Sequence, residues 1–291
     1  MTTITLQSPQ VGVSLPTGLS EELLLSFSPF NNWLKTLTKS LSLQHSDSNH
    51  PFHKDPYALR SIEVQSYDLW GSARIGFLKM RAKVTNSAGE ALPGAVFLRG
   101  PAVAMLVMLL PDDIAGTEKE ERYVLLTIQP RIPAGSLAFA ELPAGMVDDE
   151  DDGASGGKFA GTAAREIKEE LGLEIPSSEL ISLSDLAADR GKHGTEGAGE
   201  GLPEGMYPSA GGCDEFIPIL MHERRVPRDT LGEWQGKLTG LRETGEKITL
   251  KLVPMKDLWW EGRHDAKALA AVALWEALRR EGRLHEKREK L

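Results

Sequence analysis

The most informative stretch of this chain is the acidic run Arg165-Glu166-Ile167-Lys168-Glu169-Glu170-Leu171-Gly172-Leu173. On a helix, Glu166, Glu169 and Glu170 stand at positions i, i+3 and i+4, so their side chains converge on one face. Like charges this close together repel one another, and a hard divalent cation bound by oxygen atoms relieves the repulsion. The run therefore predicts a helix that binds Mg²⁺, with Mn²⁺ as the alternative.

The same run also predicts how the helix is held and where it ends. Ile167 and Leu171 lie four residues apart and give the helix an apolar stripe for docking onto a core. Gly172 is the glycine expected just beyond a helix end. Arg165 can pair with one carboxylate and leave the others to a metal. Considered by itself, however, such a charged run is also typical of a solvated helix face.

The order of the residues favours the metal site, because it resembles the second half of the Nudix box. Nudix hydrolases cleave nucleoside diphosphates that are linked to another group. The resemblance implies an α/β fold, the Nudix α/β/α sandwich with a mixed sheet. It also implies that Glu166, Glu169 and Glu170 are metal ligands and that Arg165 belongs to the catalytic residues.

The first half of the box departs from the family pattern. Gly145 lies twenty residues before Arg165, which is six more than in the family, and Gly157 occupies the position of a glutamate midway between them. The acidic run of residues 148–152 contains the candidate substitutes for that glutamate. One outer metal ligand is therefore left unassigned.

Four further segments resemble the branch of the family that acts on ADP-ribose and ADP-sugars. The segment Glu141-Leu142-Pro143-Ala144-Gly145 is similar to its Leu-Pro-Ala-Gly element, whose alanine offers a backbone carbonyl to the metal. The resemblance thus makes Ala144 a metal ligand. It also implies that Arg131 and Arg99, in flanking strands, contact the substrate, and that Glu215, in a substrate loop, adds a contact.

Two motifs narrow the resemblance to the plant chloroplast type of ADP-sugar diphosphatase. They are Gly211-Gly212-Cys213-Asp214-Glu215 and Gln235-Gly236-Lys237-Leu238-Thr239-Gly240-Leu241-Arg242-Glu243. This branch hydrolyses the diphosphate of ADP-sugars such as ADP-glucose or ADP-ribose to AMP and a sugar phosphate, which for ADP-glucose is a sugar 1-phosphate. Its general base lies in a loop before the last strands, which here means Glu243 or Glu246. The sequence does not decide between the two.

Two other functions remain open at this point. A metal held by these ligands binds the diphosphate and not the group attached to it. Another nucleotide-sugar or a dinucleotide is therefore an alternative substrate. The missing glutamate and the longer loop of the box motivate the second alternative, a catalytically weak module that binds and senses a nucleotide.

The composition excludes several other classes of function. The 291 residues include 42 acidic and 33 basic side chains, for a formal net charge of −9. Binding to nucleic acid or to an anionic membrane requires a basic surface, so we expect neither. The longest apolar run, residues 102–110, is shorter than the about 20 residues that span a bilayer. Because the N-terminus lacks a basic and apolar signal sequence, we expect a cytoplasmic protein, with a plastid as the open alternative.

Periodicity divides the chain into three parts. Residues 1–58 are expected to form a helical extension, capped at Ser20, that ends in a linker at residues 40–55. Residues 59–95 indicate a small antiparallel sheet, and the family resemblance implies that this segment forms a homodimer. Residues 96–291 are expected to form the catalytic domain. Its predicted elements are strands at residues 103–110, 123–128, 137–141, 216–221 and 248–253 and a closing helix at residues 265–280.

Overall fold

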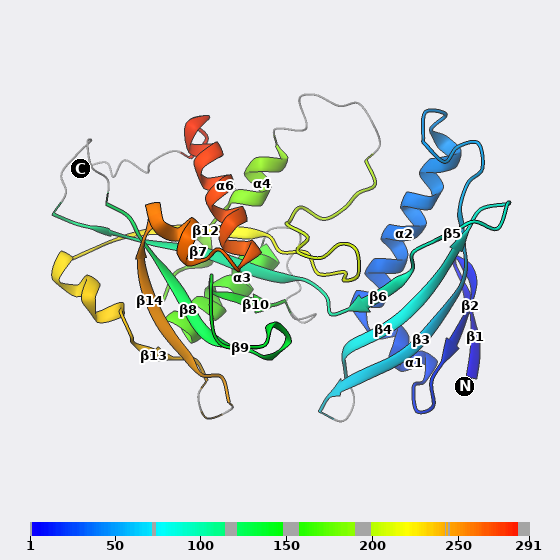
Figure 1. Ribbon diagram of the computed structural model, residues 1–291, viewed down its shortest axis with the longest axis horizontal. Coiled ribbons are helices and arrows are strands. Elements are labelled where there is room, and N and C mark those ends of the chain that lie inside the picture. Colours follow the sequence, from blue (N-terminus) through cyan, green and yellow to red (C-terminus); the bar gives the residue numbers. More distant parts are fainter. Residues whose placement is uncertain are drawn as a thin grey trace. The chain divides into compact units, whose positions relative to one another are not determined.

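The computed structural model describes residues 2–71, 74–113, 121–147, 157–189, 199–241, 243 and 245–284 (Figure 1). Its contacts divide the chain into two units. The first unit consists of Met1–Pro101, Glu196–Pro203 and Ser209–Phe216. The second consists of Ala102–Thr195, Glu204–Pro208 and Ile217–Leu291.

The first unit contains a six-stranded sheet. Its strands are β1 (Thr2–Gln7), β2 (Gln10–Leu15), β3 (Ala58–Trp70), β4 (Arg74–Thr85), β5 (Ala91–Leu92) and β6 (Ala95–Leu98). β2 runs parallel to β3, and the other pairs are antiparallel. The sequence predicts a helical extension and a linker before residue 58 and no strand, but Val11, Val13 and Leu15 alternate inward along β2 and extend the sheet.

Two helices, α1 (Glu21–Leu25) and α2 (Ser28–Ser46), pack on this sheet. Ser20 caps α1 as predicted, because its side chain accepts a hydrogen bond from the backbone N–H of Leu23 at 3.1 Å. Leu24 and Phe30 are fully buried among the apolar side chains of the strands. The helices thus cover one face of the sheet and complete the core of this unit.

The linker predicted at residues 40–55 is wrong in its first half, because α2 continues to Ser46. The buried side chain of Gln44 explains the difference. Its amide group donates to the carbonyl of Tyr57 at 3.1 Å and accepts from the N–H of the same residue at 2.8 Å. A polar residue that suggested a solvated linker therefore ties the end of the helix to the start of the sheet.

The second unit is built on an eight-stranded mixed sheet. Its strands are β7 (Ala102–Pro111), β8 (Tyr123–Arg131), β9 (Ser136–Glu141), β10 (Ala144–Met146), β11 (Ile181–Ser182), β12 (Ile219–Val226), β13 (Leu238–Thr239) and β14 (Ile248–Pro254). β12 runs parallel to β7, and the other pairs are antiparallel. The five predicted strands are present as β7, β8, β9, β12 and β14, with shifted ends.

Strand β7 separates the two halves of the core, and all of its residues are buried. Met105 and its alternate neighbours pack with Ile167 and Leu171 of the acidic helix, whereas Leu106 and Met108 pack with the closing helix. A strand that is apolar on both faces requires a layer of helices on each side. The unit is accordingly an α/β/α sandwich with a mixed sheet, which confirms the fold class that the sequence predicted.

The helices of this unit lie on both faces of the sheet (Figure 1). They are α3 (Gly157–Glu166), its continuation η2 (Ile167–Leu171), α4 (Leu183–Ala188), α5 (Leu258–Glu261), α6 (Ala266–Arg280) and the short turns η1 (Ile132–Ala134), η3 (Ser177–Glu179), η5 (Arg228–Trp234) and η7 (Met255–Asp257). No helix in the described part of the chain combines the length and the hydropathy needed to cross a membrane.

Candidate active site

The acidic run forms the end of one helix, as predicted. Ile167 and Leu171 are fully buried, and they anchor the helix on the sheet. Gly172 ends the helix in the left-handed conformation (φ 68°), which glycine adopts without strain. One detail differs from the prediction. The turn from Ile167 to Leu171 is a π-helix, a wider turn that is common at functional sites.

The centre of the site is the carboxylate of Glu170, which is only 2% exposed. One of its oxygens accepts a hydrogen bond from the backbone N–H of Ala144 at 3.1 Å. Burial raises the pKa of Glu170 well above 4.5, and the charges of Glu166, Glu246 and Glu141 raise it further. The fold therefore brings four carboxyl groups together, from the helix, from the end of β9 and from the loop before β14.

Glu166 lies directly against β10, which begins at Ala144 within the Leu-Pro-Ala-Gly element. A Cβ atom at Gly145 would overlap the carboxyl group of Glu166, so glycine at this position leaves room for the side chain where it lies. Arg165 lies beside the same carboxyl group, with its Nη2 atom 4.0 Å from Oε1 of Glu166. The glycine of the motif thus has a physical purpose, which is to let the helix and β10 approach closely.

Glu169 is half-buried on the same turn of the helix. Within the described part of the chain it forms no hydrogen bond or ion pair, so its carboxylate is available to a cation. The acidic run of residues 148–152 lies outside the described residues. The substitute for the missing glutamate of the box therefore stays a prediction.

The structure distinguishes the two candidates for the general base. Glu246 is half-buried, and its charge acts on Glu170. One of its carboxylate oxygens accepts a hydrogen bond from the N–H of Leu241 at 2.8 Å, which fixes the side chain within the loop. Glu243, in contrast, is exposed. Of the two, the fold brings Glu246 to the acidic cluster.

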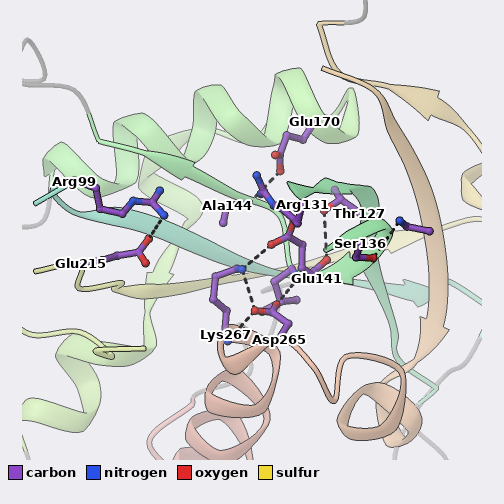
Figure 2. A network of polar contacts seen from close by, with 12 residues as sticks. Arg99, Thr127, Arg131, Ser136, Glu141, Ala144, Glu170, Glu215, Asp265 and Lys267 are labelled. Atoms are coloured by element: carbon purple, nitrogen blue, oxygen red, sulfur yellow. Dashed lines mark hydrogen bonds and ion pairs between the residues drawn. The ribbon is translucent and has the colours of Figure 1, made fainter. Parts of the chain in front are cut away.

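Arg131 belongs to a network of buried charges that the sequence did not predict (Figure 2). Its Nε atom lies 2.6 Å from Oε1 of Glu141, and its side chain is 41% exposed, so part of the guanidinium faces solvent. The other oxygen of Glu141 lies 2.8 Å from Nζ of Lys267, which also contacts Asp265 at 2.9 Å. The one feature of the local sequence that could have indicated this network is the position of Glu141 next to the Leu-Pro-Ala-Gly element.

Arg99 and Glu215 form an ion pair, with 3.1 Å between Nη1 and Oε1. The pair lies within the first unit, whereas the acidic cluster lies in the second. Asp214 holds the adjacent backbone by accepting hydrogen bonds from the N–H groups of Arg99 and Gly100. The structure thus brings both residues into one polar group, and their contact with substrate stays a prediction.

The donor set of the cluster fits a hard divalent cation. Among the described residues, no three acidic, histidine or cysteine side chains form a ready-made metal cage. Even so, the buried carboxyl of Glu170 carries the repulsion of its acidic neighbours, and a bound cation would remove that repulsion. Oxygen donors of this kind suit Mg²⁺ or Mn²⁺ better than zinc or copper.

Comparison with known proteins agrees with this geometry. The model of the NUDIX domain matches residues 102–275, which include the acidic helix and the strands around it. The chain belongs to the Nudix family. Over 263 residues it is 36% identical to Nudix hydrolase 14, chloroplastic, from Arabidopsis thaliana, and the match covers 90% of this chain and 74% of that protein. The Nudix resemblance seen in the sequence is therefore confirmed.

Two solved structures are also similar to this chain. A crystal structure of an ADP compounds hydrolase has a TM-score of 0.43 and 17% identity, and the match covers 78% of this chain and 99% of that one. A mutT/nudix family protein from Listeria innocua has a TM-score of 0.33 and 18% identity, over 63% of this chain and 96% of that one.

The contact between Gly145 and Glu166 gives a first prediction. Gly145→Ala should push the carboxyl group of Glu166 out of place and weaken Mn²⁺ binding about tenfold or more. Gly145 has no positive φ, so the backbone itself tolerates alanine. The control is Gly161→Ala in α3, where an added Cβ meets nothing within 4 Å. Calorimetric titration should show normal Mn²⁺ affinity for the control, and normal affinity for Gly145→Ala would contradict the assignment.

The raised pKa of Glu170 gives a second prediction, for the metal-free protein. Because the folded-state pKa lies above the unfolded value, the folded state holds the proton more tightly, and stability falls as the pH rises above 4.5 through the folded-state pKa. Glu170→Gln removes the charge. The variant should therefore be more stable than the wild type near pH 8, with a smaller difference near pH 5.

Urea unfolding in EDTA at the two pH values measures this difference. Glu174→Gln is the matched control, because Glu174 is exposed and pairs with Lys168 at 2.8 Å. That pairing lowers the pKa of Glu174, so its loss should not stabilise the protein. Equal stability of the wild type and Glu170→Gln near pH 8 would show that the cluster is not under repulsion.

Proposed function

We propose that this Nudix hydrolase cleaves the diphosphate of ADP-sugars, such as ADP-glucose and ADP-ribose, to AMP and a sugar phosphate, which is glucose 1-phosphate or ribose 5-phosphate. The observation that carries the proposal is the convergence of Glu166, Glu170 and Glu246 beside the Leu-Pro-Ala-Gly element. That element and the motif at residues 211–215 support the ADP-sugar branch within the family. The acidic cluster itself supports attack on a diphosphate, whichever group is attached to it.

The residues proposed to hold Mg²⁺, or Mn²⁺ in its place, are Glu166, Glu169, Glu170 and the backbone carbonyl of Ala144. When bound, the cation neutralises the diphosphate and lowers the pKa of the attacking water. The chain prepares this site before any cation arrives. The hydrogen bond from the N–H of Ala144 to Glu170 fixes the two proposed ligands beside each other.

We propose Glu246 as the general base that takes a proton from the attacking water. A general base must lie within hydrogen-bond reach of the reacting atoms. Of the two loop glutamates, Glu246 is the one whose charge acts on Glu170 in the acidic cluster. Arg165 is proposed to steady the cluster through Glu166, at a distance of 4.0 Å.

Arg131 is proposed to bind the phosphate groups of the substrate. Glu141 fixes its Nε atom, while the exposed part of the guanidinium keeps donors for an incoming anion. Gln129, two residues earlier on β8, supports the same role. Its side chain is buried, and its amide nitrogen has no hydrogen-bond partner among the described residues. A buried donor of this kind calls for a ligand or a water molecule. Arg99 and Glu215 remain proposed substrate contacts.

The assay that tests the function is release of the nucleoside monophosphate, which is AMP from ADP-glucose, ADP-ribose and a diadenosine polyphosphate and GMP from GDP-mannose, with Mg²⁺ or with EDTA. We expect Mg²⁺-dependent release of AMP from the two ADP-sugars and little turnover of the others. Turnover of only GDP-mannose or the dinucleotide would keep the chemistry and change the substrate. No turnover of any substrate would favour the nucleotide-sensing alternative.

The two loop glutamates provide a matched pair of variants. Glu246→Gln should lower kcat by about 10²–10⁴-fold, because the amide cannot take the proton. Its oxygen can still accept the hydrogen bond from Leu241, so the loop should keep its shape. Glu243→Gln should leave kcat within about twofold, since its side chain is exposed. The reverse pattern in steady-state kinetics would make Glu243 the base.

We also propose that the chain forms a homodimer through the sheet of its first unit. Leu69, Trp70 and Phe97 are exposed, although they are large and apolar. The rings of Trp70 and Phe97 both contact Phe77, with centroids 5.4 and 5.5 Å apart, so they form one aromatic group. Exposed groups of this kind commonly mark protein interfaces.

For the cellular location, we propose the cytoplasm, with a plastid as the alternative that the name of the Arabidopsis relative favours.

Light scattering tests the dimer. The wild type should have twice the mass of the 31.8 kDa chain. Phe97→Ser should raise the dissociation constant at least about 30-fold, the effect of losing an interface hot spot. Phe52→Ser, at an exposed phenylalanine elsewhere in the same unit, is the control and should not change the mass. A monomeric wild type would contradict the proposal.

A further inference from the structure

Three charged side chains in the second unit are buried although none of them is a proposed metal ligand, general base or substrate contact. Glu141 ends β9, and Asp265 and Lys267 lie at the start of α6, more than 120 residues later in the chain. The side chains of Glu141 and Asp265 are 3% exposed, and that of Lys267 is 13% exposed. Removing charges from water is costly, and apolar residues of similar size are often at least as stable. The group therefore requires an explanation beyond stability.

The contacts of these residues form a closed ring (Figure 2). Nζ of Lys267 lies 2.8 Å from Glu141 and 2.9 Å from Asp265. Asp265 then accepts a hydrogen bond from the N–H of Leu142, the residue after Glu141, at 2.9 Å. With Arg131, the group contains two positive and two negative side chains, so its charges balance. Burial lowers the pKa of Lys267, but the charges of Asp265 and Glu141 outweigh it and raise the pKa.

A helix cap alone does not account for this arrangement. Asp265 caps α6 with Oδ1, which accepts from the N–H of Lys267 at 3.0 Å. Its second oxygen, Oδ2, is the one that binds the N–H of Leu142. Capping needs only one oxygen and no buried lysine. The additional contacts all lead to the segment that precedes Ala144.

That segment is fixed at each of its residues. Leu142 is held by Asp265, and the carbonyl of Pro143 accepts a hydrogen bond from the N–H of Met105 at 2.9 Å. The N–H of Ala144 donates to Glu170. Gly145 lies against Glu166. Contacts with α6 thus fix the start of the segment, and contacts with the acidic helix fix its end.

We propose that Lys267 and Asp265 are positioning residues for the metal-binding segment 141–145. They act through Glu141 and Leu142, which they hold so that Ala144 and the acidic helix keep the spacing that a divalent cation needs. Through Glu141 they also fix Arg131. This inference rests on the metal-dependent function proposed above. Partners that orient metal ligands in this way commonly change metal affinity about 10- to 100-fold when they are removed.

Titration of Mn²⁺ into purified, metal-free full-length protein tests the inference, with calorimetry as the readout and no substrate present. Lys267→Met keeps the length of the side chain and removes its charge, so it should bind Mn²⁺ at least about tenfold more weakly. Lys267→Arg keeps a cation between the two carboxylates and should restore most of the affinity. Lys251→Met is the control, because Lys251 forms a similar 2.6 Å pair with Glu261 on a more exposed part of the sheet.

Thermal unfolding of the same variants separates positioning from a structural role. If Lys267→Met is folded, or merely less stable, and binds Mn²⁺ like the wild type, the inference is overturned. If Lys267→Met does not fold, Asp265→Asn takes its place, since asparagine can still cap the helix. Wild-type Mn²⁺ affinity in Asp265→Asn would then overturn the inference. If the wild type itself binds no Mn²⁺, the proposed metal-dependent function fails, and this inference fails with it. Weaker binding in Lys267→Met, with normal binding in Lys251→Met, supports the inference.

Discussion

Repulsion between buried carboxylates is the constraint on which the active site of this protein depends. Glu170 lies almost out of solvent, with the charges of Glu166, Glu246 and Glu141 around it. Nothing in the apolar core requires this arrangement, and without a cation it destabilises the folded state. Other contacts in the fold must therefore keep these carboxylates together despite their repulsion. Several features of the second unit provide such contacts.

Three features hold the acidic helix in place. Ile167 and Leu171 bury its apolar side against β7, a strand whose residues are buried on both faces. Gly145 has no Cβ and so leaves room for the carboxyl group of Glu166 against β10. On the opposite side of the sheet, α6 reaches the same segment through Lys267 and Glu141. Packing, close backbone approach and paired charges therefore all act on one short stretch of chain.

Features encoded by local sequence could be predicted, and features that depend on distant residues could not. The acidic helix with its glycine end, the apolar strand β7 and the Ser20 cap all follow from patterns within a few residues, and the structure contains them. The choice between Glu243 and Glu246 depends on how a loop folds back to the helix, which no local pattern specifies. The ring of Glu141, Asp265 and Lys267 joins residues more than 120 positions apart.

Two local features differ from the prediction. The turn at the end of the acidic helix is a wide π-turn, whereas the spacing of its residues predicts an ordinary α-helix. The polar side chains in the last turns of α2 indicate a linker, yet the partner that buries Gln44 is Tyr57, thirteen residues away. At the end of α2, a tertiary contact therefore outweighs the local preference of the sequence.

The central claim is that the carboxylates around Glu170 bind a cation because the bound cation removes their mutual repulsion. Release of protons on metal binding tests this claim most directly. Mg²⁺ would be titrated into metal-free protein near pH 6 in two buffers with different heats of ionisation. Because the pKa of Glu170 is raised, binding should displace protons, so the heats should differ between the buffers, and less so for Glu170→Gln. Absence of binding, or equal heats in both buffers, would contradict the account.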